Sequence, residues 1–146
     1  MTLEGIDLNP GSARAASRAT PAEMSIHYRT GDVFGYNPRP PADFIVSSQF
    51  THHLTDPEVV SFLQWLEHHA RRGWFIADLH RHPVAYYGFR LLAWIARWHP
   101  IVRYDGTISV ARSFRRSDWR ALLAAAGVTA DIHWHLPFRL CVGRLK

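Results

Sequence analysis

The ten-residue stretch IVSSQFTHHL, residues 45–54, places six polar side chains directly after two apolar residues. The six are Ser47, Ser48, Gln49, Thr51, His52 and His53. Histidine changes its charge near neutral pH and commonly acts as a general base. His52 or His53 could therefore remove a proton from a substrate hydroxyl. The stretch indicates a site for acid–base chemistry at the point where an apolar strand ends.

Polar residues also follow three other apolar segments. Asp7 ends LEGID, Asp32 lies in the short sequence GDV, and His80 and His82 follow WFIADL. In nucleotide-binding α/β folds, a carboxylate at a strand end accepts hydrogen bonds from ribose hydroxyls. A second aspartate could accept a hydrogen bond from the amino group of an adenine. Both aspartates also suit turns, since Asp7 begins the sequence DLNP and Asp32 follows a glycine. This alternative stays open for each.

Strand and helix patterns alternate along the chain. The predicted strands are residues 3–8, 24–28, 44–47, 74–79, 131–136 and 138–142. The predicted helices are residues 12–20, a segment that starts at 55–58 and ends at Gly73, residues 83–99, and residues 119–126 capped by Ser117 and Asp118. The proline-rich segment 34–41 is expected to be a loop.

This order describes an open α/β sheet closed by an antiparallel pair of strands. Ligands of such sheets bind at the carboxyl ends of the strands. The polar residues described above all lie at predicted carboxyl ends, so we expect them to share one edge of the sheet.

Composition limits the class of protein. The chain has 146 residues, of which 47% are hydrophobic, enough for one domain with a sizeable core. Its apolar segments are shorter than the roughly 20 residues that cross a bilayer, and the N-terminus does not resemble a signal peptide. A single cysteine suits a reducing compartment. We therefore expect one soluble, cytoplasmic domain spanning residues 1–146.

The net charge of +5 rests on 16 arginines and one lysine. The arginine pairs at 71–72 and 115–116 are isolated and form no long basic stripe. An ordinary arginine-rich surface explains this better than a nucleic-acid footprint, and no nucleic-acid partner is expected.

Four motifs together resemble the class I S-adenosylmethionine-dependent methyltransferases. They are GIDLNP, TGDVF, DFIVSSQFTHHL and TDPEVVSFLQWL, in this order. The resemblance is to the small-molecule branch, including the quinone-biosynthesis type, and runs from about Leu3 to the final strand. It implies a Rossmann-like open sheet and S-adenosylmethionine as the cofactor.

The resemblance also implies roles for individual residues. Those expected to hold the cofactor are Asp7 at the ribose, Asp32 and Val33 at the adenine, and Ser47, Ser48 and Gln49 at the methionine end. His52 and His53 would be catalytic. His80, His82 and Tyr86 would face the substrate, and Asp78 would face the same cavity. Methyl transfer of this kind requires no metal.

One departure from the family is large. The family's glycine-rich turn lies roughly 20 residues before the acidic ribose ligand, yet Asp7 is the seventh residue here. We therefore expect that the first strand, its loop and its helix are missing and that the sequence is truncated at its N-terminus. A sheet edge left open in this way would favour a homodimer.

Two features allow more than one interpretation. The apolar helix predicted at 84–98 suits a core helix, a lid over an apolar substrate, or a surface in peripheral contact with a membrane. The ten histidines include several pairs, but adjacent histidines on a helix point in different directions and HExxH is absent from the sequence. No metal site is expected.

The sequence thus predicts methyl transfer from S-adenosylmethionine to a small, apolar or phenolic acceptor. Two alternatives remain open. One is a methyltransferase-fold remnant that acts through protein contact, and the other is a basic nucleic-acid-binding module.

Overall fold

The computed structural model describes residues 2–146. Contacts along the chain divide it into two compact units, Met1–Arg39 and Pro40–Lys146, and each is described by itself. The single domain expected from the sequence stays a prediction.

The first unit is a parallel strand pair joined by a helix. Strands β1 (Leu3–Asp7) and β2 (Ile26–Thr30) pair in parallel, with helix α1 (Pro10–Ala19) between them in the chain. α1 begins two residues earlier than predicted, because Asn9 caps it: the Asn9 side-chain oxygen accepts the Gly11 N–H at 2.8 Å. β2 lies two residues further along the chain than predicted.

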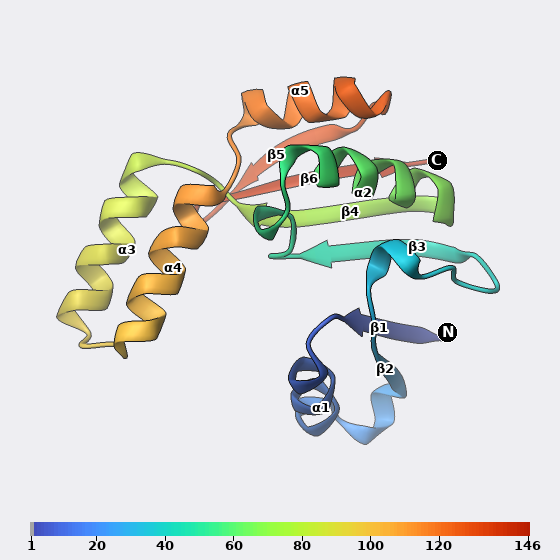
Figure 1. Ribbon diagram of the computed structural model, residues 1–146, viewed down its shortest axis with the longest axis horizontal. Helices are drawn as coiled ribbons and strands as arrows, with labels where there is room; N and C mark the ends of the chain where they lie inside the picture. Colours follow the sequence, from blue (N-terminus) through green and yellow to red (C-terminus); the bar gives the residue numbers. More distant parts are fainter. Residues whose placement is uncertain (1) are drawn as a thin grey trace. The chain divides into compact units, whose positions relative to one another are not determined.

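The second unit is built on a four-stranded mixed sheet (Figure 1). Its strands are β3 (Ala42–Ser48), β4 (Ala70–Leu79), β5 (Asp131–His135) and β6 (Arg139–Leu145), in the order β3-β4-β6-β5. β3 and β4 are parallel, whereas β6 runs antiparallel to both β4 and β5. This confirms the open α/β sheet and its C-terminal antiparallel pair.

Helices α2 (Asp56–His69) and α5 (Arg116–Ala126) form the core with one face of this sheet. Along β4 the residues alternate, so that Trp74 and Ile76 are buried while Phe75 between them is exposed. The buried side chains of the helices are Val59, Phe62, Leu63, Leu66, Trp119, Leu122, Leu123 and Ala126. Burying one such side chain contributes about 1.5–3 kcal/mol, so this layer holds β4 in place, and β3 pairs with β4.

Helix boundaries follow local capping chemistry. Glu58 accepts the Thr55 N–H at 2.7 Å, as the predicted capping box requires. α2 ends at His69 rather than near Gly73, because the chain passes directly into β4 at Ala70, which pairs with β3. α5 ends as predicted, with Gly127 in the left-handed conformation at φ 69°.

α5 begins earlier than predicted. Arg115, rather than Ser117 or Asp118, is the residue that precedes its first turn. Asp118 lies three residues further on and accepts the Arg115 N–H at 2.8 Å, so a capping interaction exists but in a different register.

A helical hairpin projects from the sheet end where β4 finishes (Figure 1). It consists of α3 (Pro83–Ile95) and α4 (Pro100–Arg112). The sequence predicted α3, but residues 100–112 were not recognised as a helix. The interpretation of α3 as a core helix is wrong, because Ala93 is its one buried residue.

Gly106 explains both why α4 was missed and how it packs. Glycine disfavours helix interiors by about 1 kcal/mol relative to alanine, so Gly106 weakens the helical pattern of residues 100–112. In the structure, a Cβ on Gly106 would lie 2.3 Å from Cζ of Phe89 on α3. The missing side chain lets the two helices approach closely.

We predict that Gly106→Ala lowers the free energy of unfolding relative to Gly88→Ala by about 1–3 kcal/mol, because the added methyl group overlaps the Phe89 ring. Gly88 lies in α3, and a Cβ added there would meet no atom within 4 Å. The two variants gain the same helix propensity, and urea denaturation compares them. Equal stabilities would contradict the close packing.

Candidate active site

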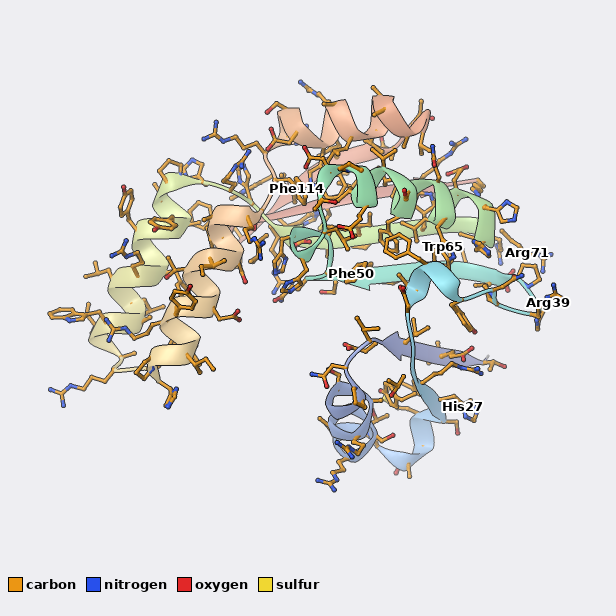
Figure 2. The ribbon with its side chains drawn as sticks, viewed as in Figure 1. His27, Arg39, Phe50, Trp65, Arg71 and Phe114 are labelled. Atoms are coloured by element: carbon orange, nitrogen blue, oxygen red, sulfur yellow. The ribbon has the colours of Figure 1, made fainter. Side chains whose placement is uncertain are left out.

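The carboxyl ends of β3 and β4 meet at one edge of the sheet. Ser48 lies opposite Ala77, and the Gln49 N–H donates to the Ala77 carbonyl at 2.9 Å. The chain then forms a single 3₁₀ turn, Thr51–His53. Figure 2 labels Phe50, which precedes this turn and packs edge-on against Phe62 of α2 at 5.2 Å. This contact holds the start of the turn against α2.

Asp78, the penultimate residue of β4, is the centre of this site. Its side chain is fully buried. One carboxylate oxygen, Oδ2, accepts the Thr51 hydroxyl and the His52 N–H, the latter at 3.1 Å. The other, Oδ1, accepts His52 Nδ1–H at 2.7 Å and the Leu79 N–H at 2.7 Å. Four donors therefore converge on one buried carboxylate.

These donors keep Asp78 charged. Burial alone would raise the pKa of Asp78, but the hydrogen bonds from His52 and Thr51 outweigh it and hold the pKa below its ordinary value. A buried carboxylate is stable only when its lone pairs are satisfied in this way.

The contact with Asp78 fixes the orientation of the His52 ring. Because a carboxylate can only accept hydrogen bonds, Nδ1 of His52 carries the proton in this pair. In neutral His52 the other nitrogen, Nε2, then presents a lone pair. An aspartate that orients a histidine in this tautomer is an arrangement that enzymes use for general bases.

His53 lies beside His52, with 4.1 Å between their ring centroids. Its side chain is exposed, whereas that of His52 is buried. Desolvation of part of the ring, followed by the charge of His52, lowers the pKa of His53. Both effects favour the neutral form of His53. α4 also packs against this turn.

His80 and His82 lie directly after β4, at the same edge. The Nδ1 atom of His80 is buried and has no hydrogen-bond partner within residues 2–146. Burial, and then the charges of His82 and two arginines, lower the pKa of His80. His82 caps α3, since its Nδ1 accepts the Val84 N–H at 3.2 Å, and its ring stacks on Phe138 at 5.4 Å.

The remaining predicted residues of this unit are less closely gathered. Ser47 and Ser48 end β3, and Gln49 follows with a left-handed φ of 52°. Tyr86, in the first turn of α3, contacts Arg90, with 5.5 Å between its ring and the guanidinium carbon. The structure thus brings the histidines to one edge and leaves Tyr86 on the hairpin.

Asp7, Asp32 and Val33 lie in the first unit, where β1 and β2 end side by side. Asp7 accepts the Asn9 N–H at 2.7 Å, and Asp32 accepts the Phe34 N–H at 3.0 Å. Both carboxylates therefore stabilise turns, as the alternative interpretation held. Val33 begins the short helical turn Val33–Gly35.

Thr51 and Asp78 are the site residues whose roles sequence reasoning did not identify. An acidic residue inside the apolar strand WFIADL was the available signal for Asp78. A charge at a strand position that alternation assigns to the buried face needs a polar partner. The sequence could not supply the partner, because Thr51 lies 27 residues away.

A cavity of about 530 Å³ lies near this edge, between the start of α2, the end of α4 and α5. Its lining includes Asp56, Arg81, Arg112 and Phe114, and none of the predicted site residues. Phe114, labelled in Figure 2, forms a parallel β-bridge with His80 just beyond the end of β4.

In residues 2–146, no group of three or more His, Cys, Asp or Glu side chains could hold a metal ion. None of the helices in this part of the chain is long and apolar enough to cross a membrane.

Comparisons with known proteins give the fold. No family model and no curated protein matches the sequence. Among solved structures, the chain is similar to magnesium protoporphyrin IX methyltransferase from Synechocystis with bound SAH, at 14% identity and a TM-score of 0.64. It is also similar to human N-acetylserotonin methyltransferase in complex with SAM, at 15% and 0.64. A third is the plantazolicin methyltransferase BpumL in complex with SAH, at 12% and 0.74.

Each of these similarities covers 99% of this chain. The chain spans 64% of the first protein, 40% of the second and 67% of the third. The chain therefore has the fold of class I S-adenosylmethionine-dependent methyltransferases, which confirms at the level of the fold the resemblance inferred from the four motifs.

We predict that Asp78→Asn lowers the free energy of unfolding by about 3 kcal/mol or more, because all four partners of Asp78 donate and an amide offers one acceptor oxygen. Urea denaturation measures this loss. The control is Asp43→Asn, which breaks an exposed ion pair with Arg71 at 3.6 Å and should cost less than about 1 kcal/mol. Similar losses in both variants would contradict the central role of Asp78.

Proposed function

We propose that the protein transfers a methyl group from S-adenosylmethionine to a small, apolar or phenolic acceptor, with His52 as the general base. The observation that carries this proposal is the buried Asp78–His52 pair, at the carboxyl edge of a sheet with the methyltransferase fold. A cytoplasmic location is part of the proposal and is supported by the single cysteine.

The first unit offers groups that fit the nucleoside part of the cofactor. Asp7 lies opposite Thr30 at the end of the parallel pair, and the Gly31 N–H donates to the Asp7 carbonyl at 2.9 Å, so Asp7 and Asp32 follow neighbouring strand ends. Asp7 uses Oδ1 for its turn, so Oδ2 could accept a ribose hydroxyl. Asp32 and Val33 would lie at the adenine, and Ser47, Ser48 and Gln49 at the methionine end.

When bound, the cofactor supplies a methyl group on a positively charged sulfur, which is already a strong electrophile. The protein must position the acceptor in line with the methyl group and remove the acceptor's proton. Nε2 of His52 would take the acceptor's proton, while the bound cofactor would supply the methyl group and leave as S-adenosylhomocysteine. Asp78 stabilises the imidazolium that forms.

The surroundings of the histidines favour an aromatic hydroxyl compound as the acceptor. Phe138 stacks on His82 and offers an apolar ring beside this edge. The buried Nδ1 of His80 could hydrogen-bond a polar group of the acceptor. We therefore assign His53, His80, His82 and Tyr86 to contacts with the acceptor.

For the cofactor, we predict that the protein binds S-adenosylhomocysteine and that Asp7→Asn weakens binding by roughly tenfold or more, because a charged hydrogen bond to the ribose is lost. The amide oxygen of asparagine can still accept the Asn9 N–H, so the turn survives. Isothermal titration calorimetry measures both affinities, and Glu23→Gln is the control in the same unit. Failure of the wild-type protein to bind would overturn the cofactor assignment and favour a remnant that acts through protein contact.

For the base, we predict that His52→Asn lowers the methyl-transfer rate by roughly 100-fold with little loss of stability. The asparagine Nδ2–H can replace Nδ1–H as a donor to Asp78, but no group replaces Nε2. Transfer from radiolabelled S-adenosylmethionine to a panel of phenols measures the rate. If His52→Asn retains full activity while His53→Ala loses it, His53 is the base instead.

A further inference from the structure

The α3–α4 hairpin presents an apolar surface that does not belong to the core. α3 is apolar on two faces. One face packs against α4, where Phe89 meets Gly106 and Ala93 is fully buried. The other face carries Val84, Tyr87, Leu91 and Trp94, which are between 57% and 66% exposed. Trp98 follows beyond the helix, and its ring packs on Phe89 at 5.8 Å.

The spacing of the exposed residues is that of a helix face. They follow one another at intervals of three, four and three residues, which places them in one stripe along the hairpin's first arm. In a soluble protein such a stripe normally faces the core, and a contiguous exposed one marks an interaction site. Ile101 and Tyr104 of α4 add to the exposed apolar surface, since they are 67% and 71% exposed.

The connection between the two helices forms a compact, projecting tip (Figure 1). We define the hairpin tip as residues 94–104. The Arg97 N–H donates to the Trp94 carbonyl at 3.2 Å, and His99 then caps α4 by accepting the Ile101 N–H at 3.3 Å. This short connection places indole rings, isoleucines and arginines at the end of the hairpin furthest from the sheet.

The charge of the hairpin is strongly one-sided. Residues 83–112 contain four arginines, Arg90, Arg97, Arg103 and Arg112, and a single acidic residue, Asp105. All four arginines are exposed. Exposed tryptophan, leucine and isoleucine combined with arginine are typical of helices that lie in the interface of anionic membranes.

We propose that the hairpin tip docks the protein onto the surface of a bilayer that contains anionic phospholipid. The apolar stripe of α3 enters the boundary between headgroups and acyl chains, and the arginines contact lipid phosphates. This inference stands apart from methyl transfer, because it uses none of the residues assigned to the cofactor or the base.

The charge favours a bilayer over a second copy of this chain. Two hairpin tips facing each other would bring four arginines together, Arg97 and Arg103 of each copy, and like charges opposed across an interface cost free energy. An anionic lipid surface instead complements the same charge. The stripe also matches the tryptophan-rich composition of interfacial anchors, where indole rings prefer the headgroup region.

Flotation of the whole protein with vesicles tests this proposal. One set of vesicles contains phosphatidylcholine alone, and the other contains phosphatidylcholine with phosphatidylglycerol. We expect binding to the anionic vesicles that weakens as salt rises, and weak binding to the neutral ones. The variants Ile95→Asp and Ile101→Asp should each reduce the partition coefficient by roughly tenfold or more. Arg103→Gln should reduce it less and should flatten the salt dependence.

Leu136→Asp is the matched control, because Leu136 is 79% exposed and lies in the turn between β5 and β6. It should bind vesicles like the wild type. Circular dichroism and size-exclusion chromatography with light scattering accompany each variant. The proposal is overturned if the wild type does not float with anionic vesicles, or if the hairpin variants float unchanged. It is also overturned if the wild type is a dimer that Ile95→Asp converts to a monomer, since the hairpin would then bind a second copy.

Discussion

A single buried carboxylate, that of Asp78, holds the candidate site together. It receives hydrogen bonds from a hydroxyl, an imidazole and two backbone N–H groups, and three of these four donors belong to the turn that follows β3. An ionised group costs several kcal/mol to bury unless its lone pairs are satisfied. The turn Thr51–His53 must therefore stay in place for the second unit to be stable. The same bonds orient His52, so stability and chemistry depend on one interaction.

The rest of the second unit supports this contact from one side. α2 and α5 cover the face of the sheet that carries Trp74 and Ile76, and Phe50 packs on Phe62 of α2. The opposite face leaves Phe44, Val46 and Phe75 exposed. β4 continues into His80 and His82 and then into the hairpin. The histidines thus lie between a rigid sheet and a projecting pair of helices whose outer surface is apolar and basic.

The sequence predicted the features that depend on residues close together in the chain. β1, β3 and β4 were found as apolar runs, α2 through Thr55 and Glu58, and the histidine-rich turn through the residue types that follow Val46. Contacts between distant residues could not be read in this way. The hydrogen bonds of Asp78 depend on the register of β3 against β4, because this register brings together residues that lie 26 or 27 positions apart in the sequence. α4 forms despite Gly106 because Phe89 of α3 fills the space beside it.

The first property to measure is the tautomer of His52. Long-range proton–nitrogen correlation NMR of histidine-labelled protein, at a pH where the imidazoles are neutral, reports which ring nitrogen carries the proton. We expect a protonated Nδ1 in contact with Asp78 and an unprotonated Nε2 that can act as a base. A proton on Nε2 would contradict the assignment of His52 as the base, because Asp78 would then not orient His52 and Nε2 would have no free lone pair.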